Sequence, residues 1–295
     1  MILCVSGAVA ESSLSSLSYH ISLALAQFGL GVLLVDADPA APLSEIGDLS
    51  ESGVVLDRGG SMVMRSLPAR GPSVLCGFGR ALASDPEKTI DHLQHLKNDF
   101  DVIVVDMPAT VSAASPSLLL SQADRLVIGA QFEADCMPSL TALLEACTIE
   151  RRRSGRLTLH AVLPLATSSS RESAEGAATR AHLVAALPEA FAAGGDLVRL
   201  PSSLTLQPLP TGESPYRDRL ARLAVSLRDV ATSSEDHPIS SFYSDAAETI
   251  LESDVRNPQL VLEPLSRTDF QPSPVSKPKN VFQQLLNWVS NMLRT

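Results

Sequence analysis

The order of apolar and helical segments in the first forty residues constrains the fold more than any other feature of this sequence. An apolar run at 2–5 is followed by a loop, a helical stretch at about 17–28 and a second apolar run at 32–35 that leads into Asp36. Apolar runs without polar alternation are typical of strands buried on both faces, and a helix between two such strands favours a parallel crossover. The first forty residues therefore predict a βαβ unit of a parallel sheet.

The loop between the first strand and the helix lacks the residue types that hold phosphate. Residues 6–16 read SGAVAESSLSS, with one glycine (Gly7), one glutamate (Glu11) and no lysine. A phosphate cradle needs glycines, which let backbone N–H groups approach the ligand, and a lysine that reaches the β- and γ-oxygens. The first lysine of the chain is Lys88, so no shift in alignment supplies one. We therefore expect no bound cofactor.

The rest of the first 231 residues continues the same alternation. Further apolar runs predict strands at 73–76, 102–105, 126–130, 158–163 and 197–200. Helical stretches lie between most of them, at 85–97, 116–122, 137–151 and 171–187, and an amphipathic helix closes the region at 214–231. Strands that alternate with helices predict an α/β fold of three layers, with a mostly parallel, twisted sheet and helices on both faces.

The sequence changes character after residue 231. Residues 232–280 are rich in proline and serine and predict a mobile linker, with a short helix at 241–252. Residues 281–294 predict an amphipathic helix, whose apolar stripe includes Phe282, Leu285, Leu286, Trp288, Val289, Met292 and Leu293. A helix this short is marginal in water, so we expect it to dock on a partner protein or on the inner membrane surface, with packing on the core as a third alternative.

Charge and cysteine content narrow the classes of function. A net charge of −10 argues against nucleic-acid binding through a general basic surface. The one basic cluster, Arg151–Arg153 with Arg156, lies at a predicted helix end, where arginines complement the helix dipole. The four cysteines form no CxxC pair, which favours buried free thiols in a reducing cytoplasm. No apolar run reaches the ~18 residues of a membrane span, so a cytoplasmic location is expected, with peripheral contact at the inner membrane as an alternative.

Four segments in order resemble the ParA/MinD family of deviant Walker A ATPases. They are ALAQFG (24–29) before VDADP (35–39), DFDVIVVDMPA (99–109), ADRLVI (123–128) and LPSS (200–203). The resemblance covers roughly residues 1–231 and implies a P-loop NTPase-like fold. It also implies a homodimer, or a heterodimer with a family relative.

The resemblance also assigns roles to residues around the loop. Leu14 falls on the P-loop lysine and Val9 on the signature lysine, so both lysines are missing. The retained positions are the hydroxyls of Ser15 and Ser16, the acids near magnesium, Asp36 and Asp106, the water-positioning Asp38, and Gly7 in the loop. We interpret these as vestigial, because strand-end aspartates also persist as turn and cap residues.

The combination favours a pseudo-ATPase that acts as a cytoplasmic adaptor or positioning scaffold. By analogy at the level of the fold, such a protein would serve an envelope machine such as cellulose secretion or pilus assembly. One alternative is an active ATPase with an unconventional P-loop, which would bind ATP and magnesium. Another is a chromosome or plasmid partition protein, which the acidic charge disfavours.

Overall fold

The computed structural model describes residues 1–8, 11–39, 43, 54–55, 62–67, 71–108, 114–166, 172–199 and 215–233. The chain divides into two compact units, Met1–Thr232 and Ser233–Thr295. The expected linker beyond its first two residues, the short helix at 241–252 and the amphipathic helix at 281–294 lie outside the described residues. These predictions therefore stay predictions.

The first unit is built on one sheet. Its described strands are β1 (Ile2–Ala8), β2 (Val32–Asp36), β3 (Val54–Val55), β4 (Val63–Ser66), β5 (Ser73–Cys76), β6 (Val102–Asp106), β7 (Arg125–Ala130), β8 (Thr158–Ala166) and β9 (Val198–Arg199). Their order across the sheet is β3-β4-β5-β2-β6-β1-β7-β8-β9. Neighbours from β5 to β9 run parallel, whereas β3 and β4 pair antiparallel at one edge.

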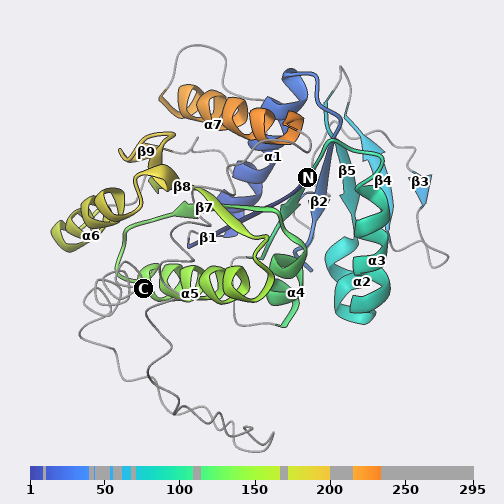
Figure 1. Cartoon of the computed structure of the whole chain (residues 1–295), viewed down its shortest axis with the longest axis horizontal. Coiled ribbons are helices and arrows are strands. Elements are labelled where there is room, and N and C mark those ends of the chain that lie inside the picture. Colours follow the sequence, from blue (N-terminus) through green and yellow to red (C-terminus); the bar gives the residue numbers. More distant parts are fainter. Residues whose placement is uncertain are drawn as a thin grey trace, which may run out of the picture. The chain divides into compact units, whose positions relative to one another are not determined.

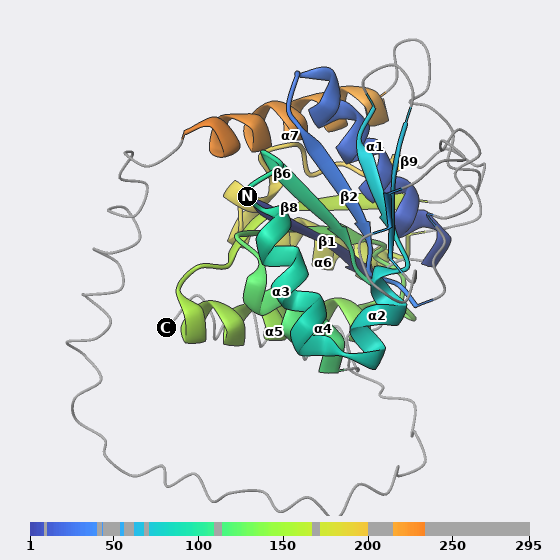
Figure 2. The ribbon, with the colours of Figure 1, turned by 90° about the vertical axis from the view of Figure 1, so that its right-hand side faces the viewer.

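Helices cover both faces of this sheet, which confirms the three-layer α/β prediction. They are α1 (Glu11–Gln27), α2 (Phe78–Ser84), α3 (Pro86–Leu96), α4 (Ala114–Gln122), α5 (Met137–Ser154), α6 (Ala174–Ala186) and α7 (Pro215–Thr232), with a 3-10 turn η2 (Glu189–Phe191) after α6. Figure 1 shows α1 and α7 together on one side of the sheet and α4 and α5 on the other. Figure 2 shows α2 and α3 on the same side as α4 and α5.

Side-chain alternation along β1 explains how one strand serves both faces. Leu3 and Val5 belong to the core cluster beneath α1 and α7. Cys4 points the other way, since its Sγ lies 3.8 Å from the Leu119 carbonyl oxygen of α4. Residues of opposite parity in a strand face opposite sides of a sheet, and both sides are covered here. This double cover is why the strand is a continuous apolar run.

The structure corrects the predicted boundaries of the loop after β1. We expected a loop over residues 6–16 and a helix from residue 17. Instead β1 extends through Ala8, and α1 begins at Glu11. Strand pairing explains why β1 extends through Ala8, because Ser6, Gly7 and Ala8 pair with Ile128, Gly129 and Ala130 of β7. Only two residues, Val9 and Ala10, separate the strand from the helix.

The strands β3 and β4 and the helix α2 were not predicted from the sequence. The strands β3 and β4 form an antiparallel edge, and α2 precedes the expected helix α3. Both strands are short and β4 contains Arg65, so neither has the apolar run that identified the central strands. Gly77, with φ of 82°, begins α2 in the left-handed conformation that glycine adopts readily.

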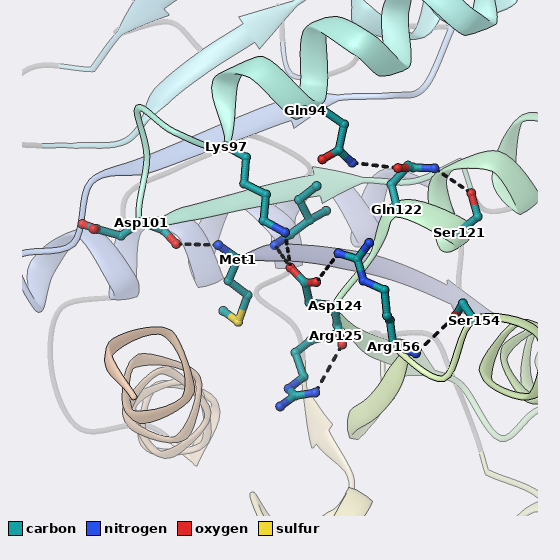
Figure 3. Close-up of polar contacts among 11 residues, drawn as sticks. Met1, Gln94, Lys97, Asp101, Ser121, Gln122, Asp124, Arg125, Ser154 and Arg156 are labelled. Atoms are coloured by element: carbon teal, nitrogen blue, oxygen red, sulfur yellow. Dashed lines mark hydrogen bonds and ion pairs between the residues drawn. The ribbon is translucent and has the colours of Figure 1, made fainter. Parts of the chain in front are cut away.

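Polar contacts tie the amino ends of the strands together at the edge opposite the β1–α1 connection (Figure 3). Asp124 accepts hydrogen bonds from the Ile2 amide at 2.8 Å and from Arg156 at 3.0 Å, and Lys97 lies 3.2 Å from its carboxylate. Burial opposes ionisation of Asp124, but these contacts outweigh it and lower its pKa. Asp124 is therefore an ionised hub that links β1 to the ends of α3 and α5.

Among the described residues, no helix combines the length and the apolar character that a membrane crossing requires.

Candidate functional site at the carboxyl edge of the sheet

The carboxyl ends of β1 and β6 meet where the chain reverses its direction across the sheet. After β1 the chain crosses over to β2 on one side, and after β6 it crosses to β7 on the other. Such a switch point is where open α/β sheets bind ligands. The candidate residues from the sequence lie around this point, so the topology brings them together.

Asp106 at the end of β6 is the centre of a buried polar cluster. Its carboxylate accepts a hydrogen bond from the Ser15 hydroxyl at 2.6 Å and another from the Ser18 hydroxyl at 2.7 Å. Burial raises the pKa of Asp106 to about 6, although the two hydroxyl donors favour its ionised form. The sequence identified Ser15 but not Ser18, which lies one helical turn further along α1 and thus on the same face.

Asp36 lies beside Asp106 on the neighbouring strand. The two residues are paired in the register of β2 and β6, and both side chains are buried. The Asp36 carboxylate accepts a hydrogen bond from the Leu43 amide at 3.0 Å. Burial, followed by the negative charge of Asp106, raises the pKa of Asp36 to about 7. The two acids therefore do not both carry a full charge near neutral pH.

Asp38 follows on the segment after β2 and is only half-buried. Helix α2 packs against the backbone here, since a Cβ on Gly79 would lie 2.6 Å from the Asp38 carbonyl carbon. Ser16 is buried on α1, one residue from Ser15. Of the predicted site residues, Ser15, Asp36 and Asp106 thus form the inner cluster, and Asp38 lies at its rim.

Gly7 does not lie in a phosphate loop. It is a strand residue of β1, paired with Gly129 of β7, and a Cβ at its position would lie 2.6 Å from the Gly129 carbonyl oxygen. The same Cβ would lie 3.1 Å from a methyl carbon of Leu14, so the leucine side chain covers the glycine. The glycine is required for close packing between two strands and a helix.

Leu14 itself is a core residue. Its side chain is 2 % exposed and lies on the same face of α1 as three other buried residues, Leu17, Ile21 and Leu25. A Cβ on Gly129 would lie 3.1 Å from Leu17 and 3.9 Å from Leu14. The leucines of α1 therefore pack on the flat surface that the paired glycines of β1 and β7 provide. The sequence alone does not predict this packing, because the resemblance assigns Leu14 only to the position of a missing lysine.

The fold has clear relatives among solved structures, although no family model and no curated protein sequence matches the chain. Cobyrinic acid a,c-diamide synthase from Mycobacterium smegmatis, with a bound ATP analog and magnesium, aligns with a TM-score of 0.55 and 19% identity over 80% of this chain and 97% of its own. The septum site-determining protein MinD from Pyrococcus horikoshii, complexed with Mg-ADP, aligns with a TM-score of 0.54 and 17% identity over 80% of this chain and 100% of its own. The cell division ATPase MinD from Pyrococcus furiosus aligns with a TM-score of 0.53 and 17% identity over 78% and 98%.

The chain has the P-loop ATPase fold of MinD.

Because the fold is that of MinD, the residues at the carboxyl edge can be compared with those that hold a nucleotide and magnesium in P-loop NTPases. P-loop NTPases hold magnesium with a P-loop Ser or Thr and an Asp at the end of a neighbouring strand. Ser15 and Asp106 have those residue types and lie 2.6 Å apart. Among the described residues, however, no group of three or more His, Cys, Asp and Glu side chains is arranged to hold a metal.

The phosphate part of the MinD-type site is not formed by the described residues. The backbone N–H of Gln131 donates a hydrogen bond to the Ala8 carbonyl oxygen at 3.0 Å, and Ala8 pairs with Ala130 of β7. The end of β1 therefore belongs to the sheet. Leu14 fills the space above Gly7. No lysine precedes Lys88 in the sequence, and Lys97 is paired with Asp124 at the opposite edge. Within the described residues, which leave out Val9 and Ala10, the geometry therefore offers acids and hydroxyls but no cradle for phosphate.

Proposed function

We propose that this chain keeps the MinD-type fold as a binding scaffold and does not hydrolyse ATP. The observation that carries the proposal is the burial of Leu14 over Gly7, because the resemblance aligns Leu14 with the P-loop lysine. A functional P-loop lysine must remain free to reach the ligand, whereas Leu14 is part of the hydrophobic core.

The energetic deficit supports the same proposal. A charge-assisted hydrogen bond contributes about 1.5–3 kcal/mol. Loss of two lysine contacts would weaken nucleotide binding by about a hundredfold or more. Strand pairing through Ala8 adds to this deficit, because backbone N–H groups used in the sheet do not point toward a phosphate.

The proposed role is that of a cytoplasmic adaptor or positioning scaffold. It would act as a homodimer or as a heterodimer with a relative, and use the predicted helix at 281–294 to dock on a partner protein or on the inner membrane. The link to an envelope machine, such as cellulose secretion or pilus assembly, is an analogy at the level of the fold. Deletion of residues 280–295 should release the protein from its cellular site without lowering its melting temperature.

Titration calorimetry tests the central claim. Full-length protein titrated with ATP and magnesium should give no saturable heat up to about 1 mM nucleotide. Saturable, magnesium-dependent binding at micromolar affinity would refute the scaffold proposal. Titration with a non-hydrolysable ATP analog reports binding alone, and phosphate release from ATP on the same protein reports turnover.

An active ATPase with an unconventional loop is the second candidate. The retained contact between Ser15 and Asp106 favours it, because these are the residue types that hold magnesium in P-loop NTPases. In that case a partner would have to supply the missing cation, as an arginine finger does in trans. Turnover in the presence of the partner that is abolished by Asp38→Ala would support this alternative.

A further inference from the structure

The last turns of α5 carry exposed side chains that belong neither to the hydrophobic core nor to the polar cluster at Asp106. We define the basic end of α5 as Ile149, Arg151, Arg152, Arg153 and Arg156. Ile149, Arg152 and Arg153 are exposed, and Ile149 is the most exposed large apolar side chain of the described residues, at 66 %. Residues at i+3 and i+4 lie beside residue i on a helix, so Arg152 and Arg153 both lie one turn beyond Ile149, toward the end of α5. The exposed Glu145 lies one turn before Ile149. The surface is therefore an exposed apolar side chain with cations on its C-terminal side.

The positive charge of this surface is only partly compensated. Arg153 lies 4.0 Å from the Glu150 carboxylate, and its own side chain is 78 % exposed. Arg156 donates to Asp124, but the same carboxylate also pairs with Lys97 (Figure 3). Two cations thus share one acid beside the exposed arginines. The net charge of the whole chain is −10, so the positive charge at the end of α5 is local and opposite in sign to that of the chain.

The helix dipole accounts for part of the cluster but not for all of it. α5 ends at Ser154, Gly155 adopts φ of 67°, and its amide donates to the Arg151 carbonyl at 2.9 Å. Basic residues in a last turn interact favourably with the exposed carbonyls. One or two cations are sufficient for this interaction with the helix dipole. The interaction does not explain why Ile149, beside them, is exposed to solvent.

We propose that the basic end of α5 binds an acidic segment of a partner protein that also carries an apolar residue. Every cation of the surface is an arginine, and the planar guanidinium forms paired hydrogen bonds with carboxylates that lysine does not match. Ile149 would contact the apolar residue of the same segment, and the acids next to that residue would meet Arg152 and Arg153. Charge complementarity therefore identifies the chemistry of the partner.

The same features disfavour the other polyanions. DNA affinity grows with the number of phosphates that cations neutralise, and the four arginines of this surface neutralise few of them. A phosphate backbone also leaves Ile149 without an apolar contact. A bilayer surface calls for a broad apolar face, and the other large apolar residues of α5, such as Met137, Leu140, Leu143 and Leu144, are buried against the sheet.

The inference is independent of the nucleotide question, because α5 lies on the sheet face away from α1. An adaptor that binds ATP could use the same surface. Failure of the peptide test below therefore leaves the scaffold proposal intact, and micromolar ATP binding would leave the peptide test intact.

Fluorescence anisotropy on the full-length protein tests the proposal. The probe is a short labelled peptide of Asp and Glu with one central Leu, compared with a peptide in which Asn and Gln replace the acids. Only the acidic peptide should bind, and more weakly as salt rises. Arg152→Ala with Arg153→Ala should weaken its binding by about tenfold. Ile149→Ser should also weaken binding, and this effect should persist at high salt because the lost contact is apolar.

The control is Arg222→Ala, since Arg222 is an exposed arginine on α7 at a distance in sequence and on another helix. It should leave peptide binding unchanged. Equal affinity for the acidic and neutral peptides, or an unchanged affinity in the arginine variant, would overturn the proposal. So would a short duplex DNA, or vesicles of phosphatidylglycerol, that bind more tightly than the peptide and lose binding in the same variant. Melting curves of each variant establish that the fold is retained, as expected for exposed positions.

Discussion

Leu14 provides the sharpest test of the inference that the first turn of α1 packs into the hydrophobic core over Gly7. The perturbation is Leu14→Ala on the full-length protein. The side chain is 2 % exposed, and its methyl groups lie over Gly7 and near Gly129. Leu→Ala substitutions at such sites cost about 2.7–5.0 kcal/mol, because the lost transfer free energy is joined by the cost of a cavity. Two adjacent glycines have no side chains that could fill the gap, so we expect about 3 kcal/mol or more.

The expected result in a melting experiment follows from the size of the unit. For a domain of about 150–250 residues, each kcal/mol lowers the melting temperature by about 2–4 °C. Leu14→Ala should therefore lower the melting temperature by about 6–12 °C, and urea unfolding should show an earlier midpoint with an unchanged slope. Leu14→Met, which nearly conserves volume, should cost less than about 1.5 kcal/mol.

Leu118→Ala is the matched control. Leu118 lies on α4 and is 40 % exposed, so its truncation should cost under about 1 kcal/mol. The reasoning is refuted if Leu14→Ala unfolds at the same urea concentration as the unmodified protein. That outcome would mean that Leu14 does not pack over Gly7 in the hydrophobic core. Substitution of a residue that binds a ligand would be expected to weaken ligand binding rather than to lower the free energy of unfolding.

Three further predictions concern acids and a glycine. Burial raises the pKa of Asp36 to about 7 and that of Asp106 to about 6, so between about pH 4 and 7 the folded protein holds protons that the unfolded chain has released. These groups should make the free energy of unfolding fall as pH rises through that window, and Asp36→Asn should flatten the decline in urea midpoints measured across it. Gly176→Ala should cost about 2 kcal/mol or more in urea unfolding, because a Cβ there would overlap the Phe132 carbonyl oxygen at the start of α6. Asp124→Asn should cost about 1–2 kcal/mol at low salt and less at high salt, since it removes the charge that the half-buried Lys97 and the exposed Arg156 share.

The sequence predicted the central sheet well because the central strands carry their own signal. Each of β1, β2, β6 and β7 is a run of apolar residues covered on both faces, and burial of this kind leaves no polar alternation. The edge pair β3 and β4 was missed, since short strands at an edge have neither the length nor the uniform composition. Register between strands also escaped prediction, and it is register that places Asp36 beside Asp106 and Gly7 beside Gly129.

The sequence by itself determined which residue types are present at the site. It established that no lysine precedes Lys88, that acids end two of the strands, and that serines occupy the start of the first helix. These are facts of composition and order, and no fold could alter them. They were sufficient to predict a nucleotide-type scaffold without its phosphate-binding cations.

Only the tertiary structure decided what the substituted residues do. A strand extends or stops according to whether its neighbour offers hydrogen bonds, and β7 offers them to β1 as far as Ala8. A helix begins where its apolar face can be buried, and the paired glycines give Leu14 such a surface from the first turn of α1. Both decisions depend on β7, more than a hundred residues away in the chain, so local sequence could not contain them. The loop that sequence presents as deficient is thus a short connection between a longer strand and a longer helix.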